Sequence, residues 1–233
     1  MKYKRVMLKL SGEFLQGSLA SGIDQKIIKR AADEILEIAN SGVEIIVEVG
    51  AGNIYRGKSA SKEIQRNIAD IIGMLGSITN AICLREAIGH RKETRALSAI
   101  FMPYVIQHYT PAKAIHYLEE KKIVILGGGT GMQFFTTDSG AVLHALQTKC
   151  EVVLKGTNVD GVYSADPKKV KTAKKFNKIS YQEVISKKLE VMDMTAFTLA
   201  QDNNLPIFVF DITKEGNLKK AVIGEEIGTL VSV

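Results

Sequence analysis

The residues best suited to chemistry lie in a glycine-rich segment, residues 127–138, with the sequence Gly-Gly-Gly-Thr-Gly-Met-Gln-Phe-Phe-Thr-Thr-Asp. The segment follows an apolar run, residues 122–126, and precedes a helical pattern over residues 139–148. Glycines let a ligand approach the backbone, and free N–H groups at a helix N-terminus attract anions. Asp138 can cap that helix and can also orient a cation. This layout suits a phosphate-bearing substrate, but a strand–turn–helix loop without a ligand shares it.

Two further strand-like runs end in groups that could hold phosphate. Lys9, Ser11 and Gly12 end the first run, where an ammonium group and N–H donors can bind phosphate oxygens. A lone lysine at a strand end is, however, more often simply solvated. The second run ends in Gly50-Ala-Gly-Asn-Ile-Tyr-Arg-Gly. There Arg56 could clamp a phosphate through two N–H groups, or lie on the surface of an ordinary turn.

The second loop also supports a competing hypothesis. Residues 52–59 match the P-loop pattern GxxxxGK[ST], after a strand pattern and before a helical one. An apolar run that ends in an acid, Ile207–Asp211, could supply the second motif of that class. A P-loop nucleoside triphosphatase that uses Lys58 and Ser59 is therefore one hypothesis. Because a pattern this short can match by chance, the rest of the sequence must decide.

Composition limits the class of protein. The chain has 233 residues, 45% of them hydrophobic, and a formal net charge of +6, which predicts a globular protein with a substantial core. We find no nucleic-acid-binding motif, no signal peptide and no apolar run of membrane-spanning length. Cys83 and Cys150 lie far apart, and we expect both to be buried thiols. We therefore expect a cytoplasmic enzyme with neither nucleic acid nor a membrane as partner.

Strand and helix patterns alternate along the chain. Residues 61–88 are predicted as one helix with an apolar face of Ile64, Ile68, Ile71, Ile72 and Leu75. Residues 158–178 are expected to be irregular. The remaining predicted strands are residues 5–10, 43–49, 95–100, 122–126, 151–155, 206–212 and 228–231, and the remaining helices are 24–40, 111–118, 139–148, 181–187 and 195–203. Such alternation predicts an α/β fold with a largely parallel sheet covered on both faces, and ligands at the carboxyl ends of its strands.

Several separated motifs together resemble the bacterial uridylate (UMP) kinases, which belong to the amino acid kinase superfamily and lack a P-loop. The resemblance runs in order from about Lys4 to the C-terminus, which is far more specific than one octapeptide, so Lys58 and Ser59 become incidental. The motifs are Lys9-Leu-Ser-Gly-Glu13, Gly50-Ala-Gly-Asn53 with Arg56-Gly57, Arg66 with Asp70 and Gly73-Met74, Gly129-Thr-Gly131 with Phe134-Phe-Thr-Thr-Asp138, Lys155 with Asp160-Gly-Val-Tyr163 and Asp166-Pro167, and Val191-Met-Asp193.

The resemblance implies a fold and an activity. The fold would be a single three-layer αβα sandwich over residues 1–233, with a mainly parallel sheet of about eight strands. Residues 1–150 would mainly form the acceptor side, and residues 151–233 the ATP side. The enzyme would transfer the γ-phosphoryl group of ATP to UMP with Mg²⁺, giving UDP for pyrimidine biosynthesis. Members of the family are typically homohexamers that GTP activates and UTP inhibits.

The resemblance also implies roles for individual residues. Lys9, Arg56 and Asp138 would be catalytic, with Asp138 orienting Lys9. The ATP site would comprise Lys9, Leu10, Ser11, Gly12, Gly52, Arg56, Thr157, Asn158, Tyr163 and Asp166. The UMP site would comprise Ala51, Asp70, Thr130, Gly131, Met132, Gln133, Phe134, Phe135, Thr136 and Thr137. The GTP-responsive segment would be Gly17, Ser18, Leu19, Ala20, Ser21 and Gly22. No residue is expected to bind the metal directly.

Some of these residues also have purely structural interpretations. Asp70 lies four residues after Arg66, which suits an intrahelical ion pair, and Asp193 can cap the following helix. A lysine at a strand end, such as Lys155, is more often solvated than bound to phosphate. The four histidines lie outside the motifs and are expected on the surface or in packing: His90, His108, His116 and His144.

The sequence departs from the family at two places, which leaves other hypotheses open. The family has a third glycine at Ala51, and Asn-Pro where this chain has Met132-Gln133. These changes put strict recognition of UMP in question. A related kinase with a carboxylate or carbamate acceptor is one alternative, although Arg66 with Asp70 and the Asp160–Tyr163 motif resemble nucleotide-binding elements. A nucleotide-binding or storage protein that has lost catalysis on the same fold is another.

Overall fold

Short apolar runs form the central sheet in the computed structural model, which describes residues 1–55, 64–165, 167, 169–189 and 191–233. The nine strands lie in the order β4-β3-β5-β2-β1-β6-β10-β11-β9, and all neighbouring pairs are parallel except β10 with β11. Their bounds, in sheet order, are Gln107–His108, Thr94–Ser98, Ile123–Gly127, Glu44–Val49, Arg5–Leu10, Val152–Thr157, Ile207–Asp211, Thr229–Ser232 and Lys178–Ser180. The predicted, mainly parallel sheet is confirmed, and the short edge strands β4 and β9 extend it.

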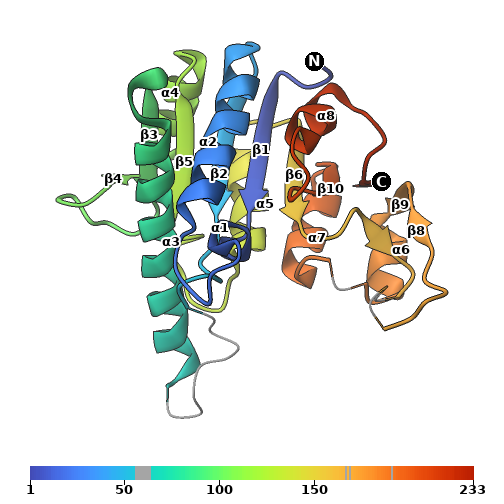
Figure 1. Cartoon of the computed structure of the whole chain (residues 1–233). Helices are drawn as coiled ribbons and strands as arrows, with labels where there is room; N and C mark the ends of the chain where they lie inside the picture. The colour runs from blue at the N-terminus through green and yellow to red at the C-terminus, as the bar shows by residue number, and fades with distance from the viewer. Residues whose placement is uncertain (56–63, 166, 168, 190) are drawn as a thin grey trace.

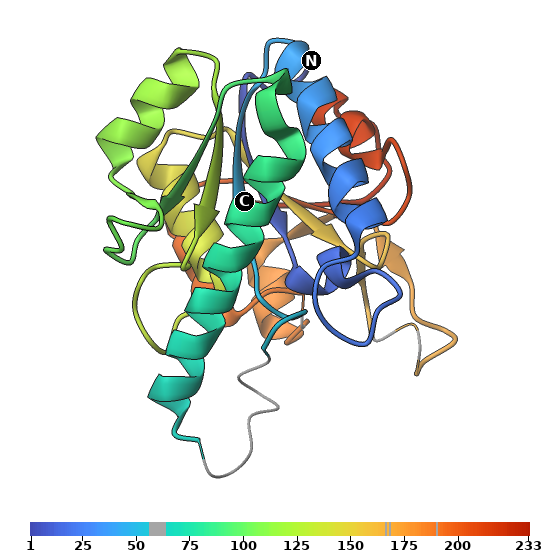
Figure 2. The ribbon, with the colours of Figure 1, turned by 60° about the vertical axis from the view of Figure 1, so that its left-hand side comes forward.

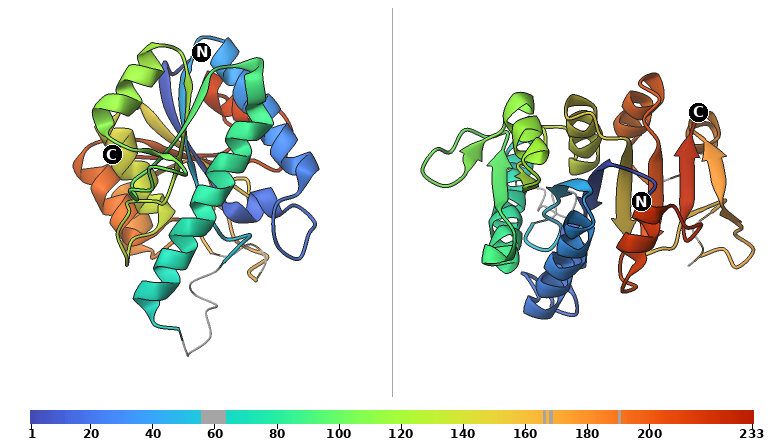
Figure 3. Two further views of the ribbon diagram at one scale, coloured as in Figure 1. Left: turned by 90° about the vertical axis from the view of Figure 1, so that its left-hand side faces the viewer. Right: turned by 90° about the horizontal axis from the view of Figure 1, so that it is seen from above.

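Helices cover both faces of the sheet, which gives three layers in the view from above (Figure 3, right). One layer contains α2 (Gln25–Asn40), α3 (Arg66–Ile88) and α8 (Asn217–Ile223). The other contains α4 (Pro111–Glu119), α5 (Thr137–Gln147), α6 (Tyr181–Ser186) and α7 (Met194–Asp202). A short helix, α1 (Gly12–Gln16), follows β1, and a 3₁₀ turn, η2 (Gly89–Arg91), ends α3. The central strands are therefore buried on both sides, which explains their nearly continuous apolar sequences (Figure 1).

Several predicted boundaries were wrong. Helix α5 begins at Thr137 and its N-cap is Thr136, so Asp138 lies in the first turn instead of capping the helix. The segment predicted to be irregular, residues 158–178, contains a hairpin of β7 (Val162–Tyr163) and β8 (Lys175–Phe176). Two-residue strands and the short helices α1 and α8 carry too little periodicity to be found from sequence.

Helix α3 differs most from its prediction. It begins at Arg66, and its N-terminal half projects beyond the sheet, so Ile68 and Leu75 are 46% and 42% exposed (Figure 2). Of the other residues predicted for the apolar face, Ile64 is exposed and Ile71 and Ile72 are only partly buried. The helix is buried mainly toward its C-terminus, at Ala81, Leu84 and Ile88. Among the described residues, the stretch Arg66–Arg91 is also long and apolar enough to cross a membrane by length and composition alone, which sequence inspection missed. Its contacts with α2, β3 and β5 identify it as a helix of the sandwich.

Two buried amides fix the loop after β2 against α3. Asn80 Nδ2 donates to the carbonyl oxygen of Gly50 and to Asn53 Oδ1, both at 2.7 Å. Asn53 Nδ2 in turn lies 3.0 Å from Asn80 Oδ1 and 2.9 Å from the carbonyl oxygen of Gly22. Because buried amides need partners, this network holds the glycine-containing loop in one position.

We expect Asn80→Ala to lower the free energy of unfolding by about 2 kcal/mol, because it leaves buried carbonyl and amide groups unpaired. Urea denaturation of the purified protein measures this change. Thr79→Ala, on the exposed side of the same helix turn, is the matched control and should change stability by less than about 0.5 kcal/mol. Equal effects of the two substitutions would show that the amide network does not hold the loop.

Candidate functional site

A carboxylate between two lysines forms the centre of the candidate site. Lys9 on β1 and Lys155 on β6 are register partners, so their side chains leave the same face of the sheet side by side. Asp138 in the first turn of α5 contacts both: its Oδ1 is 2.8 Å from Lys9 Nζ, and its Oδ2 is 2.5 Å from Lys155 Nζ. The expected contact between Lys9 and Asp138 is present, and Lys155 joins it.

Burial and mutual attraction set the charges in this cluster. Lys9 is 7% exposed and Lys155 8% exposed. Burial alone would raise the pKa of Asp138, but Lys9 and Lys155 outweigh it and hold that pKa at about 2. Burial lowers the pKa of Lys155 to about 8, although Asp138 opposes this shift. At neutral pH these three groups carry one net positive charge, which suits a phosphate group between them.

Helix α7 holds the turn that carries Asp138. The hydroxyl oxygen of Thr136 accepts hydrogen bonds from the N–H groups of Asp138 and Ser139. The Asp193 carboxylate accepts from Ala196 N at 2.9 Å, from Ser139 Oγ at 2.8 Å, and from the Thr136 hydroxyl. Asp193 is therefore the predicted cap of α7, and it also fixes the start of α5.

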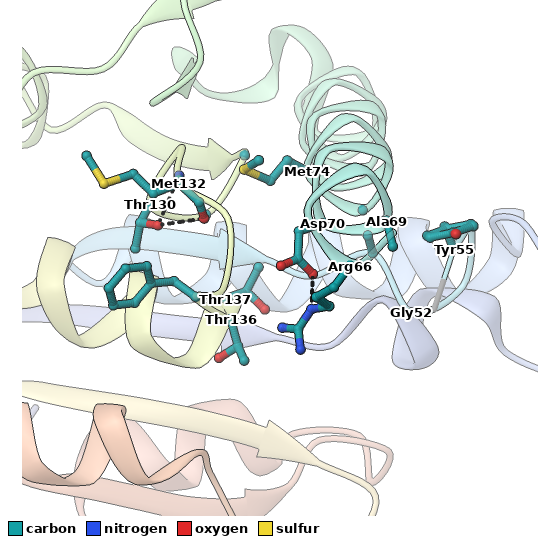
Figure 4. A pocket seen from close by; sticks show the side chains of 15 residues that line it. Gly52, Tyr55, Arg66, Ala69, Asp70, Met74, Thr130, Met132, Thr136 and Thr137 are labelled. Atoms are coloured by element: carbon teal, nitrogen blue, oxygen red, sulfur yellow. Dashed lines mark hydrogen bonds and ion pairs between the residues drawn. The ribbon is translucent and has the colours of Figure 1, made fainter. Parts of the chain in front are cut away.

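A cavity of about 230 Å³ opens between the N-terminal half of α3 and the glycine-rich segment. Figure 4 shows Asp70 and Arg66 on α3 across the cavity from the loop of Thr130, Thr136 and Thr137. Of the residues predicted for UMP, those that line the cavity are Ala51, Asp70, Thr130, Met132, Phe135, Thr136 and Thr137. The other three belong to the same described loop but not to the lining: Gly131, Gln133 and Phe134.

Asp70 links α3 to the glycine-rich segment. Its Oδ1 accepts a hydrogen bond from Arg66 Nε at 2.7 Å, and its Oδ2 accepts one from the N–H of Phe134 at 2.8 Å. Phe134 has a φ of 68°, and the Arg66 guanidinium lies 5.9 Å from its ring centre. Asp70 thus makes the intrahelical ion pair and also faces the cavity. The ion pair with Arg66 and the predicted contact with UMP are therefore compatible.

Close approaches that require glycine bring the strand-end loops together. A Cβ on Gly12 would lie 2.4 Å from the N atom of Gly52, which no real structure tolerates. A Cβ on Gly50 would lie 3.2 Å from the N atom of Gly12 and 3.3 Å from Thr137 Oγ1. The loops after β1 and β2 and the start of α5 therefore meet at one point, next to Lys9.

The alanine at position 51 fits this packing. A Cβ placed on Gly76 of α3 would lie 3.2 Å from the Ala51 Cβ. The Ala51 methyl group is thus directed at a helix position without a side chain, although Ala51 still lines the cavity. The loop accommodates the departure from the family pattern through this glycine.

Three residues predicted for the ATP nucleoside lie at or after the end of β6, on the opposite side of β1 from β2: Thr157, Asn158 and Tyr163. Thr157 ends β6, and Asn158 follows it in an exposed turn. The Tyr163 hydroxyl donates to Asp160 Oδ1 at 2.7 Å, and Lys175 Nζ donates to Asp160 Oδ2 at 3.1 Å. Asp160 therefore fixes the Tyr163 side chain.

At the end of β1, Leu10 is buried, and Ser11 caps α1 by accepting from the N–H of Phe14. Five residues singled out from sequence lie outside the described part of the chain: Arg56 and Asp166 from the ATP site, Gly57 from the motif that contains Arg56, and Lys58 and Ser59 from the P-loop pattern.

The turn predicted to respond to GTP, Gly17–Gly22, is tied to the loop after β2. The N–H of Gly22 donates to the carbonyl oxygen of Asn53 at 2.9 Å, and Asn53 Nδ2 donates back to the carbonyl oxygen of Gly22. Gln16 Nε2 donates to the carbonyl oxygens of Leu19 and Ala20. The turn is exposed but has a direct hydrogen-bonded path to the cavity-lining loop.

Lys155 was not predicted as a central residue of the site. A lysine that ends an apolar run is usually solvated, and only the pairing of β6 with β1 places this one beside Lys9. The sequence signal that could have identified Lys155 is a single charge at the end of an apolar run, Val152–Leu154. The structure shows that this run is fully buried in the middle of a parallel sheet.

The shifted pKa of Lys155 predicts a pH-dependent stability. The native protein releases this proton near pH 8, whereas an unfolded lysine keeps it to about 10.5. Between these values the unfolded chain binds more protons, so rising pH favours the native state. Relative to Lys155→Met, we expect the wild-type free energy of unfolding to rise by about 2 kcal/mol between about pH 8 and 10, measured by urea denaturation. A constant difference between the two proteins over this range would contradict the burial of a titrating amine.

Comparison with known proteins agrees with this geometry. The sequence profile described as the Amino acid kinase family matches residues 4–211. The solved UMP kinase of Bacillus anthracis has 38% sequence identity and a TM-score of 0.96, with 100% of this chain and 97% of that chain covered. The UMP kinase of Ureaplasma parvum has 33% identity and a TM-score of 0.94, with both chains covered completely.

A more distant similarity extends to the archaea. The uridylate kinase of Archaeoglobus fulgidus has 30% identity and a TM-score of 0.75, and both chains are again covered completely. Sequence profile, identity and fold therefore agree over nearly the whole length. This chain belongs to the amino acid kinase family.

Proposed function

We propose that this protein transfers the γ-phosphoryl group of ATP to UMP, giving UDP and ADP in pyrimidine nucleotide biosynthesis. The observation that carries the proposal is the placement of Asp138 between Lys9 and Lys155, next to a cavity lined by Asp70 and the glycine-rich segment. The similarity to UMP kinases of two bacteria and one archaeon supports the choice of acceptor.

Phosphoryl transfer needs positioning and charge more than covalent help. The attacking oxygen belongs to a phosphate that is already ionised at neutral pH, so no general base is required. Lys9 and Lys155 supply fixed positive charge where negative charge develops, and Asp138 holds both ammonium groups in place. The glycine loops let two phosphate tails approach the same point from opposite sides.

The two nucleotides divide the site between them. We assign the acceptor nucleotide to the cavity, where the Asp70 carboxylate can accept hydrogen bonds from ribose hydroxyls. We assign ATP to the side of Ser11, Gly12, Thr157 and Tyr163, with Arg56 and Asp166 as further proposed contacts. Gly52 also lines the cavity, so we assign it to the point where the ATP phosphates meet the acceptor. Lys9 and Lys155 would lie between the two phosphate tails.

Mg²⁺ fits this site as a companion of ATP. In the described part of the chain, no group of three or more His, Cys, Asp or Glu residues is placed to hold a metal ion. Mg²⁺ commonly binds through substrate phosphates and water with few protein ligands. When bound with ATP, Mg²⁺ would add positive charge at the phosphates, and Lys9 and Lys155 would supply the positive charge that comes from the protein.

Assembly and regulation are part of the proposal. The exposed apolar side chains of Ile68 and Leu75 on α3 support self-association, and we propose a cytoplasmic homohexamer. The hydrogen bonds between Gly22 and Asn53 support activation by GTP at residues 17–22, because they connect that turn to the acceptor cavity. Inhibition by UTP is proposed from the family alone.

The other hypotheses have less support. The P-loop pattern covers residues 52–59, of which the structure describes only 52–55, and it gives no role to the contact of Asp138 with Lys9 and Lys155. A carboxylate or carbamate acceptor has no ribose hydroxyl groups for Asp70 to accept hydrogen bonds from. Loss of catalysis does not explain why Lys9, Lys155 and Asp138 remain assembled despite the energetic cost of burying their charges.

Lys9→Met should reduce the rate of UDP formation by at least about a thousandfold, because it removes charge from the transition state. A coupled assay with ATP, Mg²⁺ and UMP, CMP, dUMP or AMP measures the rate, and UMP should be strongly preferred. Lys58→Ala is the matched lysine control and should keep most of the activity. A large loss with Lys58→Ala and little loss with Lys9→Met would reject this assignment in favour of the P-loop.

Asp70→Asn should weaken UMP binding by about tenfold, because an amide accepts ribose hydrogen bonds less well than a carboxylate does. Isothermal titration calorimetry with UMP and, separately, with ATP measures both affinities. ATP affinity should change by less than about twofold, since the ATP side lies beyond the lysine cluster. Equal losses for the two nucleotides would remove Asp70 from the ribose site.

A further inference from the structure

A second ionisable pair lies inside the protein beside the lysine cluster. Glu48 on β2 is the register partner of Lys9 on β1, so Glu48, Lys9 and Lys155 occupy one level across three neighbouring strands. Glu48 is 0% exposed, and its neighbours on this face include the apolar side chains of Ile46 and Met7. A carboxyl group in such a position is costly unless a nearby group compensates for its burial.

His144 provides part of that compensation. Its Nδ1 lies 2.9 Å from Glu48 Oε2, and it is 3% exposed. It was expected to be a surface or packing residue, and it is packed against the ring of Tyr109 at 4.5 Å between centres. Helix α5 thus carries both Asp138, which contacts the lysines, and His144, which contacts Glu48.

The second oxygen of Glu48 has no hydrogen-bond partner among the described residues. A purely structural Glu–His pair would be expected to satisfy both oxygens. The nearest strand neighbour with a complementary charge is Lys9. Burial raises the pKa of Glu48, and both His144 and Lys9 oppose that shift. Lys9 and Glu48 therefore interact electrostatically, and this attraction acts on Lys9 as strongly as it acts on Glu48.

We propose that Glu48, held by His144, is a positioning residue for Lys9 in the phosphoryl transfer proposed above. Asp138 attracts the Lys9 ammonium from the helix layer, and Glu48 attracts it from the neighbouring strand. Because α5 carries both Asp138 and His144, the partner of Glu48, one rigid element fixes the direction of the ammonium. The inference rests on the proposed function for its kinetic consequence, but the electrostatic coupling can be tested without substrate.

The groups that face Glu48 come from several elements. They are Lys9 on β1, Lys155 on β6, Asp138 and His144 on α5, and Tyr109, which follows β4. Asp193, the N-cap of α7, acts on Lys155. Lys9 is the nearest of these cations by strand order, and Lys155 is one strand beyond it, which supplies a matched control.

The kinetic test uses Glu48→Gln, which keeps the shape and the hydrogen bond to His144 but removes the charge. We expect kcat to fall about tenfold while KM for ATP and UMP changes by less than about twofold, because a misdirected ammonium affects the transition state more than binding. Ile46→Val, on the same face of β2, controls for altered packing and should leave kcat per folded molecule unchanged. Wild-type kcat in folded Glu48→Gln would overturn the proposal.

A titration tests the coupling without relying on activity. The ¹³C carboxyl resonance of Glu48 should titrate at a higher pH in Lys9→Met than in wild type, because a compensating charge is gone. Lys155→Met should shift the midpoint less, because that ammonium lies one strand further away. Identical midpoints in wild type and Lys9→Met, or equal shifts in the two variants, would overturn the proposal even if Glu48→Gln fails to fold. A shift specific to Lys9→Met in a protein inactive toward UMP would refute the proposed function alone.

Discussion

The contact of one carboxylate with two buried ammonium groups is the interaction on which the rest of the structure depends. Separately, each of these charges would be expensive to bury in the centre of a sheet. Together, Asp138 compensates for Lys9 and Lys155 and leaves one net positive charge at the ends of the central strands. Because the positive charge is already fixed in position, little rearrangement is needed when the phosphate groups of the substrates meet.

The fold serves this contact in specific ways. Parallel pairing of β1 and β6 in the observed register sets the two lysines side by side at the same edge of the sheet. Helix α5 positions Asp138 in its first turn, because Thr136 caps the helix and donates a hydrogen bond to Asp193, the N-cap of α7. Glycines at positions 12 and 50 let the neighbouring loops close around the same point. The apolar layers therefore determine where the charges meet, and the caps determine their direction.

The central strands and most helices were predicted correctly from the sequence, whereas individual buried charges and the start of α3 were not. The central strands were recognisable because they are continuous apolar runs, and Lys9 and Asp138 were found because each ends such a run or begins a helix. Lys155 was named only in a family motif and expected to be solvated, since a charge at the end of an apolar run indicates a solvated end unless the strand order is known. Glu48, inside the predicted strand 43–49, was not singled out. The start of α3 and its exposed Ile68 were mispredicted because periodicity shows which face is apolar but not what covers it. Roles carried by Arg56 and Asp166 remain predictions.

The most direct measurement is a crystal structure with Mg²⁺ and a bisubstrate analogue that joins adenosine and uridine through a chain of phosphates. The account predicts the uridine in the cavity beside Asp70 and the adenosine beyond β6. It also predicts the central phosphates within hydrogen-bond distance of the Lys9 and Lys155 ammonium groups, which remain in contact with Asp138. Central phosphates bound away from both lysines, with Asp138 still covering them, would contradict the central claim.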